Sequence, residues 1–597
     1  MTSIDELFKG AGIGSKRKIE LNHDPSHFYK SAKLSANGDA KGKTHASVEE
    51  ADENNYDDDA EAGPEMPPDD GEDPDEEGRF FGGGMDKATA AAMDYLDIAD
   101  GQEEYVQEKY DSAWIRRLAL NFEKKISKNA ELRAKYEEDP TKFLQSEADL
   151  DDEVRNLSIL AEHTDLYPEF AKLGCVASLV SLLAHENTDI AIRAIQTIGE
   201  LLDEDVEAEP EQWDALVDAA LEADIISLLT ANFSRFDESA TEEDRNGVYH
   251  SLSAVEILSS RSSVAAELSS TGPTSLLPWL LSRLQRTEKA VSQNKQYAAE
   301  ILSILLSSSP STRSSLASVS PNGIDTLLNC LAMYRKSDPS PGSTASEYFE
   351  DLFDALVLAL LTPANKAAFQ AAEGIELLLI MLRSSSLSKP RALRTLDHGL
   401  AGSSPESGAL AEHFVEAQGL GILFKLFMKK QDASTTEHLL GILSALLRLL
   451  PADSAGRIRT LAKFVERDYE KIGRLGVVRR ELEARLRGVD AAITEEKTNL
   501  KRRGDEGEIE VREEEWLARR LESGLHSLRL VDAILAWLVA EDAGAKRKIM
   551  SVLDETDQAL SNAKAVLQEQ LKEIGTPDEA EEVATAEMLS ALVSFLN

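Results

Sequence analysis

Leucine, isoleucine and alanine recur at spacings of three and four residues through almost every segment from residue 161 onward. This spacing places the apolar side chains on one face of an α-helix, and the two-residue alternation typical of β-strands is scarce. Each predicted helix must therefore bury its apolar stripe against a neighbouring helix. The pattern predicts an all-α fold.

The same kind of helix start returns along the chain and sets a repeat. A turn residue, usually glycine, precedes an apolar run, and we expect the glycine to let the chain turn sharply before the helix. Successive starts lie 45 to 51 residues apart, a period typical of a helical solenoid. The predicted architecture is a right-handed solenoid of armadillo-like or HEAT-like repeats. The six starts are Gly174, Asp224, Gly272, Gly323, Gly374 and Gly419.

The pattern also predicts how the chain is organised, with helical caps at both ends of the solenoid. Caps are needed because a terminal repeat would otherwise expose its apolar face. The predicted regions are a disordered acidic arm at 1–108, an N-terminal helical cap at 109–160, about six armadillo-like repeats at 161–460, and a C-terminal helical region with a cap at 461–597.

Two leucine patterns mark the C-terminal region. Leu475, Leu482 and Val489 keep a seven-residue spacing, but three heptads are too few to establish a coiled coil. Leucines from Leu517 to Leu535 predict one amphipathic helix, with Trp516 and Trp537 nearby. This helix either caps the last repeat or forms a homodimer interface.

Charge restricts the partners. The 597 residues carry a formal net charge of −44, which argues against direct binding to nucleic acid and favours basic protein partners. Residues 49–77 hold 16 Asp or Glu and no Lys or Arg, a composition that predicts disorder. Lys16, Arg17 and Lys18 form a local basic spot, which is either a nuclear-localisation signal or a chance run.

No catalytic, metal or cofactor site is predicted. "GRFFGGGM" at 78–85 and "NGDAKGKT" at 37–44 contain glycines but lack the preceding strand that a phosphate-binding loop needs. Ten histidines occur without an H-E-x-x-H pair, and the two cysteines, Cys175 and Cys330, are expected to be reduced core residues. The N-terminus lacks a secretory pattern, and no uncharged apolar run reaches the ~18 residues of a membrane span.

Several long motifs resemble one known family. They are "EEGRFFGGGM", "DSAWIRRLALNFEKKISKNAELRAKY", "HTDLYPEFAKLGCVASLVSLL", "NTDIAI", "EYFEDLFDAL" and "LDHGLAG". Together they closely resemble the family of beta-catenin-like protein 1, nuclear armadillo proteins associated with the spliceosome. The resemblance implies a non-enzymatic subunit of the nineteen complex that binds nuclear-localisation-like basic segments, including those of its Myb-domain subunit. "GRFFGGGM" is then either a docking segment anchored by Phe80 and Phe81 or a flexible hinge.

An acid recurs when the long helices of the repeats are aligned on their apolar residues. In armadillo folds generally this helix lines the concave groove, and importin-like proteins carry asparagine at this position. Carboxylates there would form charge-assisted hydrogen bonds with Lys or Arg. We call these residues the acidic ladder and predict that they bind a basic peptide, although solvated acids would give the same pattern. The acidic ladder consists of Glu200, Glu256, Glu300, Asp354 and Asp397; the sixth repeat has no acid there.

Two other functions are compatible with an armadillo fold. A nuclear transport adaptor of the importin-α type would need tryptophan and asparagine pairs along its groove. None of the five tryptophans is followed by asparagine one helical turn later, so this class is the alternative and not the leading prediction. An adhesion adaptor would need basic groove residues for acidic tails, which the pattern lacks.

Overall fold

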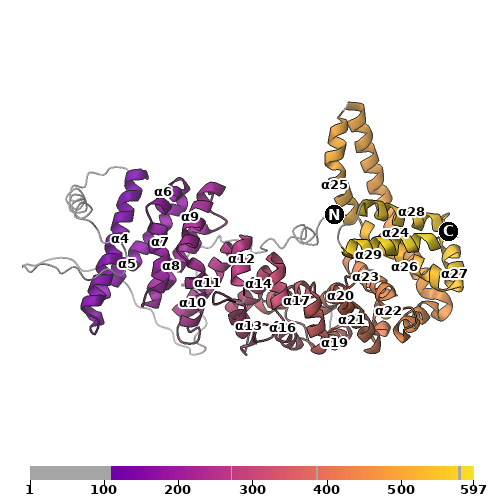
Figure 1. Ribbon diagram of the computed structural model, residues 1–597, viewed down its shortest axis with the longest axis horizontal. Helices are drawn as coiled ribbons and strands as arrows, with labels where there is room; N and C mark the ends of the chain where they lie inside the picture. The colour runs from indigo at the N-terminus through magenta and orange to yellow at the C-terminus, as the bar shows by residue number, and fades with distance from the viewer. Residues whose placement is uncertain (1–108, 271, 385–386, 504, 576–579, 597) are drawn as a thin grey trace, which may run out of the picture. The chain divides into compact units, whose positions relative to one another are not determined.

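The computed structural model describes residues 109–270, 272–384, 387–503, 505–575 and 580–596 (Figure 1). These residues form α-helices, short 3₁₀ helices and turns, and no β-strand occurs among them. The predicted all-α, armadillo-like fold is confirmed. The expectations for residues 1–108, including Lys16, Arg17, Lys18, Phe80 and Phe81, lie outside the described residues.

The N-terminal end of the described chain is a pair of packed helices, α4 (Ser112–Lys135) and α5 (Leu144–Asn156). The Asp111 carboxylate starts α4 by accepting hydrogen bonds from the backbone N–H groups of Ala113 and Trp114 at 2.9 and 3.0 Å. Such a cap satisfies donors that have no partner within the helix. Ile115 and Phe122, four and eleven residues from that cap, are fully buried.

Six triplets of helices follow, each ending in a longer third helix. The triplets succeed one another along the colour gradient of Figure 1. They are α6 (Tyr167–Lys172), α7 (Cys175–Ser181) and α8 (Thr188–Leu202); α9 (Pro210–Glu222), α10 (Ile225–Arg235) and α11 (Glu242–Leu258); α12 (Ser262–Leu268), α13 (Leu277–Gln285) and α14 (Gln293–Ser308); α15 (Pro310–Ser315), α16 (Gly323–Ala332) and α17 (Thr344–Ala359); α18 (Pro363–Ala371), α19 (Gly374–Ser384) and α20 (Ser388–Gly399); α21 (Pro405–Glu416), α22 (Gly419–Phe427) and α23 (Ala433–Leu449).

The third helices stack into one continuous series, which we call the third-helix row. α8, α11, α14, α17, α20 and α23 each pack against the next, and α5 packs against α8 at the start of the series. A helix in such a series touches neighbours on both sides, which explains why apolar residues surround much of its circumference. In α14, for example, Ala298, Ala299, Ile301, Leu302 and Leu305 are all completely buried.

Glycine at the helix starts has two different roles. Gly174 has φ +80°, so it does turn the chain as expected, and Asp224 adopts the same left-handed region with φ 61°. At the fifth and sixth starts the left-handed residue is instead the one before the glycine, Glu373 or Gln418. Gly272 and Gly323 do not adopt the left-handed region either, so a left-handed glycine makes the turn at Gly174 alone among the six starts.

Close packing explains the glycines at the fifth and sixth starts. A Cβ atom at Gly374 would overlap the ring of Phe369, and one at Gly419 would overlap the ring of Phe414. Both rings belong to the preceding helix and are buried. Glycine at these positions therefore lets an aromatic side chain lie directly on the backbone of the next helix.

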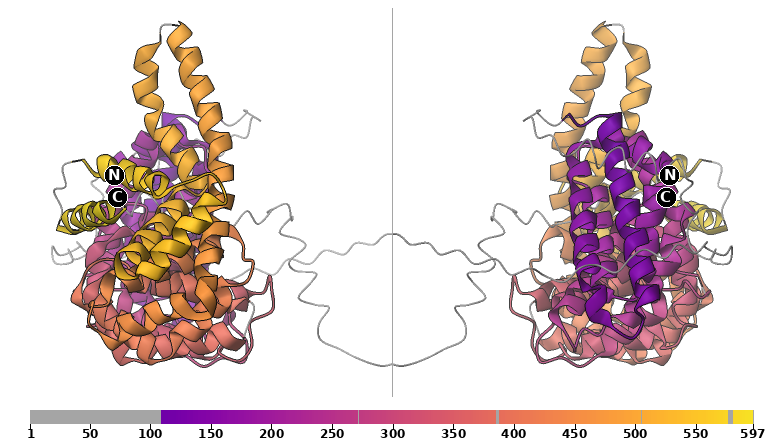
Figure 2. Two further views of the ribbon diagram at one scale, coloured as in Figure 1. Left: turned by 90° about the vertical axis from the view of Figure 1, so that its right-hand side faces the viewer. Right: turned by 90° about the vertical axis from the view of Figure 1, so that its left-hand side faces the viewer.

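The C-terminal region contains a projecting helical hairpin. α24 (Ala455–Arg503) is broken by non-helical backbone at 466–469, and its second part pairs with α25 (Glu506–Glu522). The hairpin core consists of Ile493, Leu500 and Trp516, with Val489 and Ile509 packed against it. Figure 2 shows the hairpin extending away from the other helices in both views.

The single amphipathic helix predicted around Leu517 to Leu535 is wrong. The chain turns at Gly524, whose φ is +102°, and α25 and the next helix, α26 (Leu525–Glu541), are bent by 66° relative to each other. The leucine spacing continues through the turn, although α25 pairs with α24 and α26 packs against α23. α26 packs against α23 and extends the third-helix row by one member.

Three further helices complete the C-terminal region: α27 (Ala543–Asp554), α28 (Leu560–Ile574) and α29 (Ala580–Phe595). All three pack against α26. The side chains of Arg479 on α24 and Asp532 on α26 are buried and joined by two hydrogen bonds of 2.6 and 3.2 Å. This ion pair fixes the end of the third-helix row to the hairpin.

Candidate functional site

The acidic ladder lies at matching positions of the third-helix row. Its members come from α8, α11, α14, α17 and α20, which pack in that order. Three of them contact the following helix in the same register. Glu256 is bound by Tyr297, Asp354 by Arg394 and Asp397 by His438, and each partner lies three residues before the next ladder position. The alignment made from apolar residues therefore corresponds to a geometric row.

The first two ladder residues have neutral partners. Glu200 accepts hydrogen bonds from Ser158 Oγ at 2.5 Å and from Gln196 Nε2 at 2.9 Å. Glu256 accepts a hydrogen bond from the hydroxyl of Tyr297. Among the described residues neither carboxylate forms an ion pair, so no Lys or Arg of this part of the chain competes with a partner's cation for them.

The third ladder residue shares its surroundings with a second acid. Gln296 Nε2 donates to Glu300 Oε2 at 3.1 Å and to Asp351 Oδ2 at 3.0 Å. One amide group thus bridges a carboxylate of α14 and a carboxylate of α17. The sequence analysis missed Asp351, although it lies one helical turn before Asp354 and therefore on the same helix face.

The last two ladder residues have charged or ionisable partners within the chain. Arg394 Nη1 lies 2.7 Å from Asp354 Oδ1, and Arg391 binds Glu350 on the same pair of helices. His438 Nδ1 lies 3.0 Å from Asp397 Oδ2. Burial raises the pKa of Asp397 above its usual value, while His438 acts in the opposite direction. These two carboxylates join α17 to α20 and α20 to α23.

The missing acid of the sixth repeat has a structural reason. Gly441 on α23 occupies the ladder position, and a Cβ atom there would overlap the carboxylate of Asp397. No side chain fits at this position while Asp397 binds His438. The ladder therefore ends at Asp397, because its carboxylate lies against α23 where the next ladder side chain would be.

Aromatic rings lie beside the first two ladder residues. The rings of Tyr249 and Tyr297 have centroids 5.3 Å apart, and those of Tyr249 and His250 are 5.7 Å apart. Burial lowers the pKa of His250, and the negative charge of Glu200 raises it. Tyr249 is half-buried and lies seven residues before Glu256, on the same face of α11. A flat ring next to a carboxylate favours the binding of a Lys or Arg side chain.

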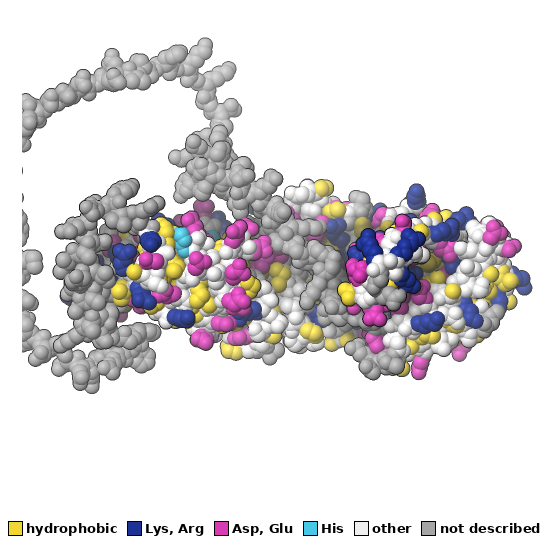
Figure 3. Space-filling model, turned by 90° about the horizontal axis from the view of Figure 1, so that it is seen from above, with side chains coloured by type: hydrophobic (Ala, Val, Ile, Leu, Met, Phe, Trp, Pro, Cys, Tyr) yellow, Lys and Arg dark blue, Asp and Glu magenta, His cyan; other side chains and the backbone are white. Residues whose placement is uncertain are grey.

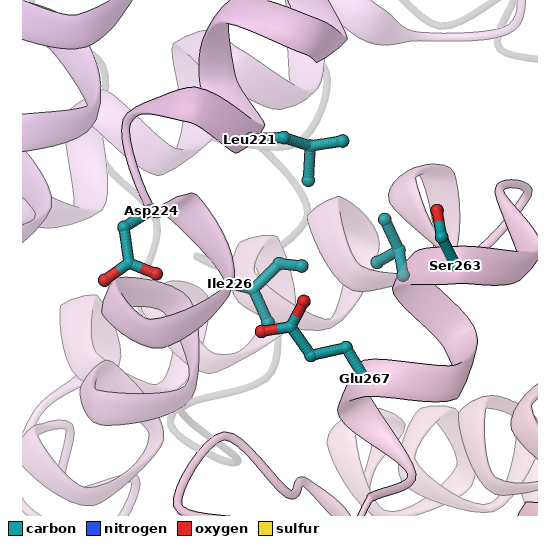
Figure 4. A pocket seen from close by; sticks show the side chains of 6 residues that line it. Leu221, Asp224, Ile226, Ser263 and Glu267 are labelled. Carbon is teal, nitrogen blue, oxygen red and sulfur yellow. The ribbon is translucent and has the colours of Figure 1, made fainter.

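A second group of acids lies at a small pocket between α10 and α12. The pocket has a volume of about 150 Å³ and is lined by Asp224, which directly precedes α10, and by Glu267 of α12 (Figure 4). Its other walls include Leu221, Ile226 and Ser263. No group of three or more His, Cys, Asp or Glu residues able to hold a metal occurs within the described chain. The pocket is lined by two carboxylates and a hydroxyl, and its described lining contains no histidine or cysteine.

The distribution of charge separates two parts of the surface. Figure 3 shows Asp and Glu side chains gathered near the first triplets, whereas Lys and Arg are concentrated at the end of the α24–α25 hairpin. Cys175 and Cys330 are free and buried, as expected. No single helix in the described ranges is long and apolar enough to cross a membrane; two bent pairs of helices satisfy length and composition alone.

Comparisons with known proteins agree with this architecture. Residues 90–568 match the family described as "Catenin-beta-like, Arm-motif containing nuclear". The chain is 37% identical over 502 residues to "Beta-catenin-like protein 1 homolog" of Schizosaccharomyces pombe, covering 83% of this chain and 86% of that protein. It is 34% identical over 477 residues to "Beta-catenin-like protein 1" of Homo sapiens, covering 78% and 82%.

The stacked triplets and these matches define the class, an armadillo-motif protein. More narrowly, the chain belongs to the catenin-beta-like family, which is described as nuclear. The resemblance predicted from the sequence motifs is confirmed.

Proposed function

We propose that the protein is a non-enzymatic scaffold that holds a basic segment of a partner protein on its acidic ladder. The main support is the pair Glu200 and Glu256, two carboxylates on adjacent helices whose partners within the described chain are neutral. A Lys or Arg side chain would form charge-assisted hydrogen bonds with them, which are stronger than neutral ones. Tyr249 would contact the apolar stem or the flat face of that cation.

The ladder residues in the first half of the third-helix row are better placed to bind a basic peptide than those in the second half. Arg394 already binds Asp354, and His438 already binds Asp397. A basic peptide would have to displace these partners in order to reach the last two carboxylates. Glu200 and Glu256 therefore contribute most to binding, while Asp354 and Asp397 contribute most to the packing of α17, α20 and α23.

The description of the family as nuclear supports a nuclear setting for this scaffold. We propose that it acts in the nucleus in pre-mRNA splicing, as a subunit of the nineteen complex. Its partners would be nuclear-localisation-like basic segments of that complex, notably of the Myb-domain subunit, with no direct contact to nucleic acid. The net charge of −44 supports basic partners, because it repels phosphates and attracts Lys and Arg.

A comparison of two double variants tests the site. Glu200→Gln with Glu256→Gln is expected to weaken binding of a fluorescent Lys- and Arg-rich peptide by about tenfold or more, because two charge-assisted bonds are lost. Asp354→Asn with Asp397→Asn removes the same charge from the same row and serves as the matched control. We expect this control to bind the peptide with nearly unchanged affinity but to melt at a lower temperature.

Fluorescence anisotropy gives the affinities, and thermal unfolding followed by circular dichroism gives the stabilities. Equal losses of affinity in both variants would show that the binding is general attraction to an acidic surface. A pull-down from nuclear extract with the same variants then tests whether the protein's partners are splicing proteins. Splicing proteins that are captured by wild type and lost with the first variant support the proposal, whereas transport receptors with varied cargo would favour an importin-like adaptor.

A further inference from the structure

A second pocket, with a volume of about 170 Å³, lies between the third and fourth triplets. It is bounded by α13, α14, α16 and α17 and by the loop between α13 and α14, and no member of the acidic ladder lines it. Leu284, Val291 and Met333 form apolar parts of its wall. Met333 is 64% exposed, so the pocket has an apolar rim open to solvent.

Lys295 brings a buried positive charge to this pocket. Only 5% of the residue is exposed, and Nζ donates a hydrogen bond to the backbone oxygen of Arg286 at 2.6 Å. An ammonium group has three donors, and no carboxylate lies within ion-pair distance of Nζ among the described residues. Burial lowers the pKa of Lys295, which is the expected response of a desolvated cation.

Tyr348 brings a hydroxyl that has no hydrogen bond. The residue is 2% exposed and lines the same pocket, and its ring lies 5.6 Å from Lys295 Nζ. The hydroxyl is beside the thiol of Cys330, but sulfur is a weak partner, and that thiol points to the backbone oxygen of Leu284 at 3.5 Å. A buried hydroxyl without a partner destabilises the fold.

The other charges at the pocket are already paired. Glu288 lies 2.8 Å from Arg283 Nη1 and accepts the backbone N–H of Ser292 at 3.0 Å. Arg286 Nη1 lies 2.9 Å from Glu238. Lys295 and Tyr348 therefore remain as two neighbouring buried donors that face a small space with apolar walls. An acceptor that carries negative charge would satisfy both donors.

We propose that this pocket binds a carboxylate attached to a small apolar body, with the carboxylate held by Lys295 and Tyr348 and the body held by Val291 and Met333. A basic pocket for an acidic ligand is a function separate from the acidic ladder, whose ligands are basic. The carboxylate can belong to a free acid or to the C-terminal residue of a peptide chain, and both sources present the same group.

Binding of two probes to the full chain tests the pocket. Benzoate represents a free acid, and a tripeptide ending in phenylalanine represents a chain end; benzamide is the neutral control. Isothermal titration calorimetry should show saturable binding of at least one acid and none of benzamide. Tyr348→Phe should weaken that binding by about tenfold or more, because it removes a hydrogen bond to a charged group.

The variants separate binding from folding. Tyr348→Phe removes a buried hydroxyl that makes no hydrogen bond in the protein, so a melting temperature equal to or above that of wild type is expected. Lys295→Met should abolish binding, and Lys289→Gln, a change at an exposed lysine on the same loop, should leave it unchanged. The proposal is overturned if neither acid binds, if benzamide binds as well as benzoate, or if the Tyr348→Phe variant binds like wild type.

Discussion

At the scale of single residues, glycines decide how closely neighbouring helices approach. Gly374 and Gly419 lie against the rings of Phe369 and Phe414, and Gly441 lies against the carboxylate of Asp397. At each place the missing side chain is replaced by a group from another helix. The position of a single glycine in the sequence therefore affects how the helices of a triplet pack.

Two glycines of α22 allow this role to be measured. Gly419→Ala is expected to destabilise the protein by about 1–3 kcal/mol, because the new methyl group overlaps Phe414 in a close-packed core. Gly421→Ala lies in the same helix with no atom within 4 Å of the added Cβ, and should stabilise it by up to ~1 kcal/mol. Urea unfolding followed by circular dichroism gives both values. Equal effects of the two changes would contradict the packing explanation.

The residues of the candidate site could be predicted only in part. The positions of Glu200 and Glu256 follow from helix periodicity, because an acid at a fixed distance from apolar residues must return to the same face. Their partners do not follow, because Tyr297 and Ser158 come from neighbouring helices 41 and 42 residues away in the chain. The pairing of Asp354 with Arg394 could not be predicted for the same reason, because the two residues lie on neighbouring helices. This pairing changes the expected role of Asp354 from peptide binding to helix packing.

At the scale of helices, a buried ion pair connects the hairpin to the row. Arg479 is 1% exposed and Asp532 is fully buried, and Arg479 also binds Glu483 and Gln558. A buried charge is tolerated only while its partner remains. The contact therefore orients α24 against α26 as well as holding them together.

Removing one partner should be worse than removing both. Arg479→Met leaves the carboxylate of Asp532 buried without a counter-charge and is expected to lower the free energy of unfolding by about 3–5 kcal/mol. The double variant with Asp532→Leu should recover most of that loss, because two apolar side chains can pack where the pair was. Denaturant unfolding of wild type, both single variants and the double variant completes the cycle. A double variant as unstable as Arg479→Met would show that other contacts of Arg479 dominate.

Helices were easier to predict than the turns between them. Spacings of three and four identify α8, α11 and α14, because apolar residues there repeat over four turns or more. The break at Gly524 was missed because leucines continue on both sides of it with helical spacing. The left-handed backbone of Gly524 and the packing of α26 on α23 show that a separate helix begins at Leu525.

At the scale of the whole molecule, each repeat packs against the one before it through the third-helix row and so buries part of its apolar surface. α26 packs on α23, so the apolar face of the sixth triplet is buried by the C-terminal region. In such a linear array, stability comes mainly from contacts between neighbours. The division of the chain at residues 109, 161 and 461 that the sequence predicts remains a prediction.

Truncation tests whether the C-terminal helices act as a cap. A chain ending at Ala452 lacks α24 to α29 and exposes the side of α23 that α26 covers. We expect it to aggregate or to melt at a lower temperature and less cooperatively than the full chain. Circular dichroism melts with light scattering compare the two. A truncated chain as soluble and stable as the full one would show that the sixth triplet needs no cover.

The pairing of Asp354 with Arg394 has a consequence for recognition. Here a guanidinium from one helix already sits on a ladder carboxylate of the helix before it, with an N–O distance of 2.7 Å. The protein thus contains, within its own chain, an example of the contact proposed for a partner's arginine at Glu200 or Glu256. A partner that imitates Arg394 would continue, in a second molecule, a pattern of contacts that the repeats already make with one another.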